Sequence, residues 1–112
     1  MEIGFRRYKD VYIVDVKGDM DLYNAHELKD VINKLIDKNI AKIVINLENV
    51  DYIDSSGVGA LIHIFTSVKR NGYKLRITNV HGSVAKVIKL TKLMGYFPIV
   101  EDVKTALQEL SV

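Results

Sequence analysis

Apolar residues recur at three- and four-residue intervals between residues 25 and 36, while the positions between them are mostly charged. The apolar positions are Ala25, Leu28, Val31, Ile32, Leu35 and Ile36, and Glu27, Lys29, Asp30 and Lys34 fall on the opposite side. This spacing predicts an amphipathic helix that buries one face. Asn24 directly precedes it and is predicted to cap its first turn.

A different pattern, rich in β-branched and aromatic residues, occupies the N-terminal segment. Residues 3–8 and 11–17 form two such stretches separated by Lys9-Asp10, which predicts an antiparallel hairpin. The segment from Gly18 to Asp21 then breaks the strand pattern. After the first helix, residues 42–47 form a short apolar run, which is typical of a parallel strand buried on both faces.

The second half of the chain continues this alternation of strands and helices. We expect a helix over 57–70, a strand over 75–78 and a third helix that Ser83 caps and Gly95 ends in a left-handed conformation. A brief strand at 99–100 and a last helix from Glu101-Asp102 to Leu110 complete the order β-β-α-β-α-β-α-(β)-α. Alternating strands and helices indicate an α/β fold. We therefore expect one compact domain over 1–112, with a mixed, mostly parallel, four- to five-stranded sheet and about four helices.

Composition narrows the possible functions. The chain has 112 residues, and 16 Lys and Arg against 14 Asp and Glu leave a net charge of +2, too little for direct nucleic-acid binding. The absence of cysteine excludes disulfides and thiolate chemistry. No apolar run approaches the ~20 residues that cross a bilayer, and no signal-peptide pattern opens the chain. We expect a cytoplasmic protein that does not bind membranes and is a monomer when free.

The most informative segment is Asp-Tyr-Ile-Asp-Ser-Ser-Gly-Val-Gly-Ala-Leu, residues 51–61. It follows the carboxyl end of the predicted buried strand. Ligand or partner sites of open α/β sheets lie at the edge where the carboxyl ends of the strands meet. On one interpretation, Asp54 or Ser55 merely caps the next helix and the glycines ease its packing on the sheet. On the other, Gly57 and Gly59, which each cost roughly 1 kcal/mol of helix propensity, let a partner approach closely. Local spacing leaves both interpretations open.

Catalytic and metal chemistry find little support in the sequence. The serines lack the glycine spacing of a nucleophile elbow, and no phosphate-binding loop follows them. His26, His63 and His81 lie in separate segments without the spacing of a triad or a metal site. His63 is expected to be partly buried and the other two exposed. We therefore expect no enzymatic activity, no cofactor and no metal.

Two motifs together resemble the bacterial anti-sigma-factor antagonists, whose domain type, the STAS domain, is shared with sulfate transporters. One is Asp-Ser-Ser-Gly-Val-Gly-Ala-Leu at 54–61, and the other is Gly-Asp-Met-Asp at 18–21, where many family members have Gly-Glu-Leu-Asp. The resemblance extends over essentially all of the chain and implies that Ser55 is a phosphoacceptor. The implied partners are an anti-sigma factor that is also an ATP-dependent serine kinase, and a metal-dependent serine phosphatase.

In the family, the unphosphorylated antagonist binds the kinase and releases the sigma factor, and phosphorylation ends that binding. The resemblance implies a partner-binding patch around Ser55 made of Asp21, Asp54, Ser56, Gly57, Val58, Gly59 and Ile62. Asp21 belongs to it only if its strand ends at the same sheet edge as the strand before Ser55. Three alternatives are a STAS module of a stress-signalling scaffold, a receiver-like domain with Asp54 as phosphoacceptor, and a small ligand-binding or enzymatic α/β domain.

Overall fold

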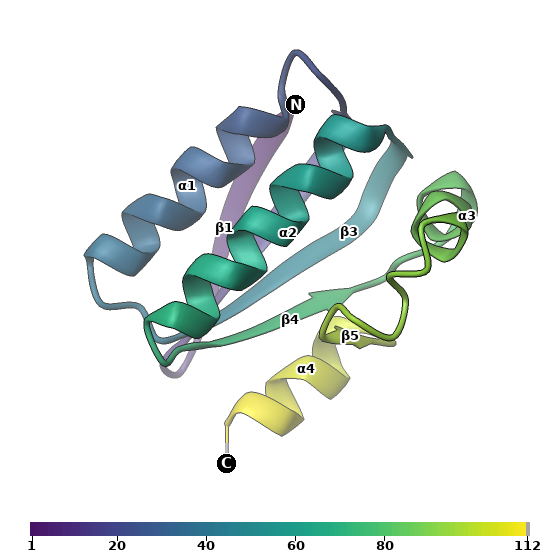
Figure 1. The fold of residues 1–112 in the computed structure, drawn as a ribbon. Helices are drawn as coiled ribbons and strands as arrows, with labels where there is room; N and C mark the ends of the chain where they lie inside the picture. Colours follow the sequence, from purple (N-terminus) through teal and green to yellow (C-terminus); the bar gives the residue numbers. More distant parts are fainter. Residues whose placement is uncertain (112) are drawn as a thin grey trace.

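Five strands form one mixed sheet in the computed structural model, which describes residues 1–111 (Figure 1). Val112, the last residue of the predicted domain, lies outside the described residues. The strands are β1 (Glu2–Tyr8), β2 (Val11–Met20), β3 (Lys42–Ile53), β4 (Lys74–Thr78) and β5 (Ile99–Val100). They lie in the order β1-β2-β3-β4-β5, with β1 antiparallel to β2 and every other neighbouring pair parallel. The predicted fold class and element order are confirmed.

The helices cover both faces of this sheet. They are α1 (Ala25–Asp37), α2 (Ser55–Arg70), α3 (Gly82–Leu90) and α4 (Val103–Leu110). In Figure 1, α1 and α2 lie side by side across one face, and their apolar residues join the larger core cluster. The short helix α4 contributes to a second, smaller cluster on the opposite face.

The strand β3 lies at the centre of the sheet and is buried on both faces. Ile43 and Ile45 belong to the larger cluster, and Val44 between them belongs to the smaller one. Alternate side chains of a strand point to opposite faces, so a continuous apolar run is what a central strand covered on both sides requires. The prediction of a buried parallel strand is confirmed, and α1 buries the face that carries Leu28 and Ile32 in the larger cluster, as its periodicity indicated.

Several element ends differ from the sequence prediction. The strand β3 continues to Ile53 rather than stopping at Leu47, and α2 begins at Ser55 rather than Gly57. The strand β2 also runs past Gly18 to Met20, because two irregularities in its pairing with β3 absorb the break. One of them is at Gly18, whose φ of 107° lies in the region that glycine tolerates best.

The helix α3 begins and ends earlier than predicted. His81 occupies the N-cap, and Ser83, the predicted cap, lies inside the helix, where its hydroxyl donates to the Asp51 carbonyl. At the other end, Lys92 rather than Gly95 adopts the left-handed conformation, with a φ of 61°. The Leu93 amide then donates back to the Ile88 carbonyl, which closes the helix before Gly95 is reached.

Candidate functional site

The two motifs that the sequence singled out lie next to each other at one edge of the sheet. Met20, at the end of β2, pairs with Ile53 at the end of β3. The Asp54 amide donates to the Met20 carbonyl at 3.2 Å, and the Leu22 amide donates to Asp54 Oδ2 at 3.2 Å. The condition for Asp21 to join the Ser55 segment is therefore met, because parallel strands end at the same edge.

The start of α2 is organised by Asp54. Its backbone is extended, with φ −115° and ψ −171°, and its Oδ1 accepts hydrogen bonds from the Ser56 amide at 2.8 Å and the Gly57 amide at 3.1 Å. These are two of the amides that the first turn of a helix leaves unpaired. Asp54, not Ser55, is thus the cap, and Ser55 is the first helical residue, with an exposed side chain.

The loop between β2 and α1 is held by its own polar side chains. Asp21 Oδ1 accepts from the Tyr23 amide at 2.9 Å and the Asn24 amide at 3.2 Å, while Asn24 Oδ1 accepts from the Asp21 amide at 3.0 Å. Asn24 does occupy the N-cap position of α1, but its side chain bonds back to the loop and not to the helix. The predicted capping bond of Asn24 is therefore wrong, and the loop gains a fixed shape instead.

The first turns of α2 present a mixed surface. Gly57 and Val58 are buried, Gly59 is exposed, and Ile62 is half-buried. A Cβ atom at Gly57 would lie 2.4 Å from the Met20 carbonyl oxygen and 2.5 Å from Ile53 Cγ1, whereas one at Gly59 would meet nothing within 4 Å. Two of the four α2 residues expected in the partner-binding patch, Gly57 and Val58, are thus buried, because this side of the helix packs on the sheet.

Two exposed apolar side chains beside this site were missed by sequence reasoning. Leu22 is 69% exposed and Tyr23 is 83% exposed, on the loop that Asp21 and Asp54 hold in place. Apolar residues in a loop carry no periodicity, so the pattern along the chain did not draw attention to them. The signal in the sequence was their position between Asp21 and Asn24, because large apolar residues are unusual in a turn, where Gly, Pro, Asn, Asp and Ser dominate.

The histidines do not form a site. His63 is exposed on α2, which corrects the prediction of partial burial, and His26 is exposed at the start of α1. His81 Nε2 lies 2.7 Å from the Glu48 carbonyl oxygen. Within residues 1–111, no three His, Asp or Glu side chains are grouped so that they could hold a metal ion. No helix in this part of the chain is long and apolar enough to cross a membrane.

Comparison with known proteins shows which family the chain belongs to. The family model for the STAS domain matches residues 2–106. The anti-sigma-B factor antagonist of Staphylococcus aureus is 32% identical over 82 residues, which cover 73% of this chain and 76% of that protein. The chain belongs to the STAS-domain family of anti-sigma-factor antagonists. A second relative, the anti-sigma F factor antagonist of Paenibacillus polymyxa, is 26% identical over 100% of this chain and 97% of its own length.

Solved structures share the fold of this STAS domain. An anti-sigma factor antagonist from Mycobacterium paratuberculosis superposes with a TM-score of 0.88 at 21% identity, over 99% of this chain and 94% of that one. The phosphorylated form of the Bacillus cell-fate determinant SpoIIAA gives a TM-score of 0.74 at 17% identity, over 97% of this chain and 99% of that one. At these identities the structural comparisons establish the architecture alone.

Proposed function

We propose that this STAS domain is an anti-sigma-factor antagonist whose binding is switched off by phosphorylation of Ser55. The observation that carries the proposal is the exposed Ser55 hydroxyl at the first position of α2, beside a capping Asp54 that also holds the Asp21 loop. The curated relatives named above support the role of antagonist. The protein acts by binding and catalyses nothing itself, and it works in the cytoplasm as a monomer when free.

Ser55 is a better acceptor than Ser56 for a structural reason. The Ser56 side chain is half-buried and its amide is tied to Asp54 Oδ1, whereas Ser55 is exposed. A kinase must bring its ATP γ-phosphate within bonding distance of the hydroxyl, so the exposed serine is the accessible one. The partner in this step is an anti-sigma factor with ATP-dependent serine kinase activity, and a metal-dependent phosphatase reverses it.

The consequence of phosphorylation follows from charge. A phosphoserine carries about −1.5 to −2 charges, and the amides at a helix start tolerate an anion there. The fold therefore remains intact. At an interface the same phosphate must lose its water beside the carboxylates of Asp54, Asp21 and Asp51, and that repulsion opposes binding.

The partner-facing patch consists of the exposed and half-buried residues around Ser55. We assign to it Asp21, Asp54, Ser56, Gly59 and Ile62, and we add Leu22 and Tyr23, which the sequence analysis had left out. Gly57 and Val58 support the patch from beneath by packing α2 on the sheet. A Gly59→Arg change tests the patch, since open space at Gly59 lets the variant fold while the new side chain obstructs docking.

The acceptor is identified by phosphate mapping. The purified protein is incubated with ATP and, one at a time, with each anti-sigma factor kinase of its own organism, and mass spectrometry locates the phosphate. We expect one kinase to modify Ser55, with no phosphate incorporated into Ser55→Ala and full incorporation into Ser56→Ala. Phosphate on the Ser55→Ala protein to the wild-type level would refute the assignment.

A further inference from the structure

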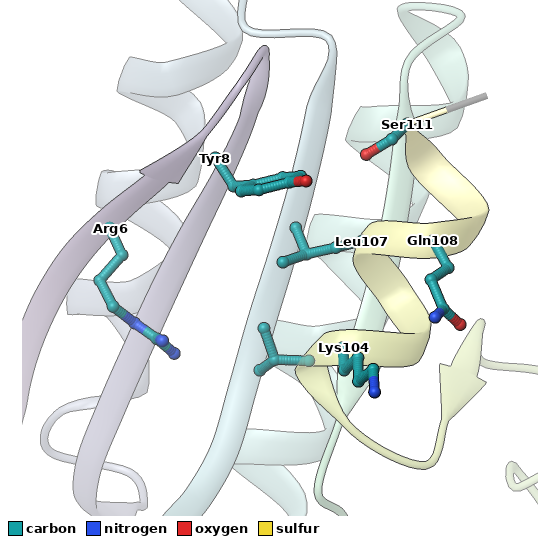
Figure 2. A pocket seen from close by; sticks show the side chains of 7 residues that line it. Arg6, Tyr8, Lys104, Leu107, Gln108 and Ser111 are labelled. Atoms are coloured by element: carbon teal, nitrogen blue, oxygen red, sulfur yellow. The ribbon is translucent and has the colours of Figure 1, made fainter.

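A groove of about 640 Å³ lies between β1 and α4, on the sheet face opposite to α1 and α2. Its lining comes from Arg6, Tyr8, Val103, Lys104, Leu107, Gln108 and Ser111. In Figure 2 the Tyr8 ring extends from β1 toward α4, and Leu107 points back toward it. The groove exists because α4 clusters with Val11 and Ile13 of β2, while most residues of the edge strand β1 remain exposed.

The groove has an apolar part, lined by Tyr8, Val103 and Leu107, and one buried polar atom of its lining lacks a partner. Tyr8 is 45% exposed, and Val103 and Leu107 are half-buried at the margin of the smaller core cluster. Ser111 Oγ is buried and has no hydrogen-bond partner among residues 1–111. A volume in the range of roughly 300 to 1,000 Å³ with apolar walls and a few polar atoms is typical of small-molecule sites.

The charged side chains that line the groove are all positive. Arg6 and Lys104 are the charged members, and the lining contains no Asp or Glu. Arg6 donates to Asp15 through Nε at 2.7 Å and Nη2 at 2.8 Å, so Asp15 offsets part of its charge. Arg6 Nη1 makes no hydrogen bond within the described part of the chain, and Lys104 forms no ion pair there. Because the Asp15 carboxylate pairs with Arg6, Lys104 supplies the one positive charge of the lining that residues 1–111 leave unpaired.

We propose that this groove binds a small, freely dissolved amphiphile that has a carboxylate head and an unbranched apolar chain, such as a medium-chain fatty acid. The chain lies along Tyr8, Val103 and Leu107. The carboxylate pairs with the ammonium of Lys104, the lining cation that forms no ion pair within residues 1–111. The site is separate from Ser55, because α2 and α4 pack on opposite faces of the sheet.

The test is a titration of the ¹⁵N-labelled protein followed by NMR. The probes are decanoate and decyltrimethylammonium, which share a ten-carbon chain and differ in the sign of the head. We expect decanoate to shift the amides of Val103, Leu107 and Ser111 in a saturable way, with a Kd of about 1 mM or tighter for a molecule of this size. Decyltrimethylammonium should bind at least about threefold more weakly, because the positive charge of Lys104 repels its cationic head.

Two matched variants locate the charge. Lys104→Glu reverses the sign at the groove and should weaken decanoate binding by about three- to tenfold, whereas Lys86→Glu on the exposed side of α3 should change it by less than about twofold. Neither variant touches the Arg6–Asp15 pair, so a folded spectrum is expected for both.

The proposal is overturned if decanoate produces no saturable shifts, if the shifted amides lie outside the groove, or if the two variants behave alike. Equal binding of the two probes would show an apolar groove without selection for an anion, which also contradicts it. If vesicles of phosphatidylglycerol shift the groove amides and free decanoate does not, the occupant is a membrane surface and not a free carboxylate.

Discussion

Gly57→Ala should destabilise this protein, although alanine is normally the better helix former. The added Cβ would lie 2.4 Å from the Met20 carbonyl oxygen and 2.5 Å from Ile53 Cγ1, both closer than side-chain atoms pack. The carbonyl is held in place because it accepts the Asp54 amide, and the Ile53 side chain is buried. The start of α2 must therefore move away from the sheet, carrying Ser55 with it.

The magnitude follows from two opposing effects. Overpacking a buried contact costs about 1 to 3 kcal/mol, and a clash with the backbone belongs at the upper end of that range. Replacing glycine by alanine within a helix returns about 1 kcal/mol. We therefore expect a net loss of about 1 to 2 kcal/mol, which corresponds to a fall in Tm of roughly 4 to 10 °C for a domain of this size.

Gly59→Ala is the matched control, because the same chemical change is made two residues away in the same helix. Its Cβ would meet nothing within 4 Å, so only the gain in helix propensity remains, about 0.5 to 1 kcal/mol. Urea unfolding followed by circular dichroism measures both variants. A Gly57→Ala protein as stable as the wild type, or two variants with equal changes in unfolding free energy, would refute the packing argument.

Two further predictions concern the acid stability and the exposed loop. The Arg6 guanidinium donates two hydrogen bonds to Asp15 and holds its pKa below the usual value, against the smaller opposing effect of burial. Such a carboxylate stabilises the fold above its unfolded pKa of about 3.9, and that stabilisation is lost as the pH falls through the lower, folded value. The difference in unfolding free energy between wild type and Asp15→Asn should thus shrink below about pH 4, and a difference that stays constant down to pH 2 would contradict this. Separately, Leu22→Ser and Tyr23→Ser should leave the Tm within about 2 °C of wild type, because neither side chain is packed, yet weaken anti-sigma-factor binding by about tenfold or more in a calorimetric titration. Leu90→Ser, at a side chain 76% exposed on α3, serves as the control and should not change binding; equal affinity of all three variants would remove the loop from the interface.

The fold was largely predictable because its strongest signals are periodic. The three- and four-residue spacing from Ala25 to Ile36 and the apolar run at 42–47 identified α1 and the core of β3. The ends of elements were harder to predict. Ser83 and Gly95 are favoured residue types for helix ends, but the end of α3 is set by the bond between Leu93 and Ile88, a contact that residue preference does not encode.

The site was only partly accessible from sequence. Ser55 and Asp54 were identified from their motif, but the closeness of the Asp21 loop depends on the parallel pairing of β2 with β3, which spacing alone did not establish. The burial of Gly57 could not be read from α2, because that helix is apolar on nearly every side and so gives no clear inner face. Exposure of Leu22 depends on the shape of a loop, which only the structure shows.

The central claim concerns the effect of one phosphate on one interaction, and the direct test compares two forms of the protein. The unmodified chain and the chain phosphorylated at Ser55 are titrated into the same purified anti-sigma factor, with release of the sigma factor measured in parallel. Desolvating a doubly charged phosphate beside Asp54 should weaken binding by at least about a hundredfold, and only the unmodified form should release the sigma factor. Equal affinity of the two forms, with sigma factor released by both, would contradict the switch.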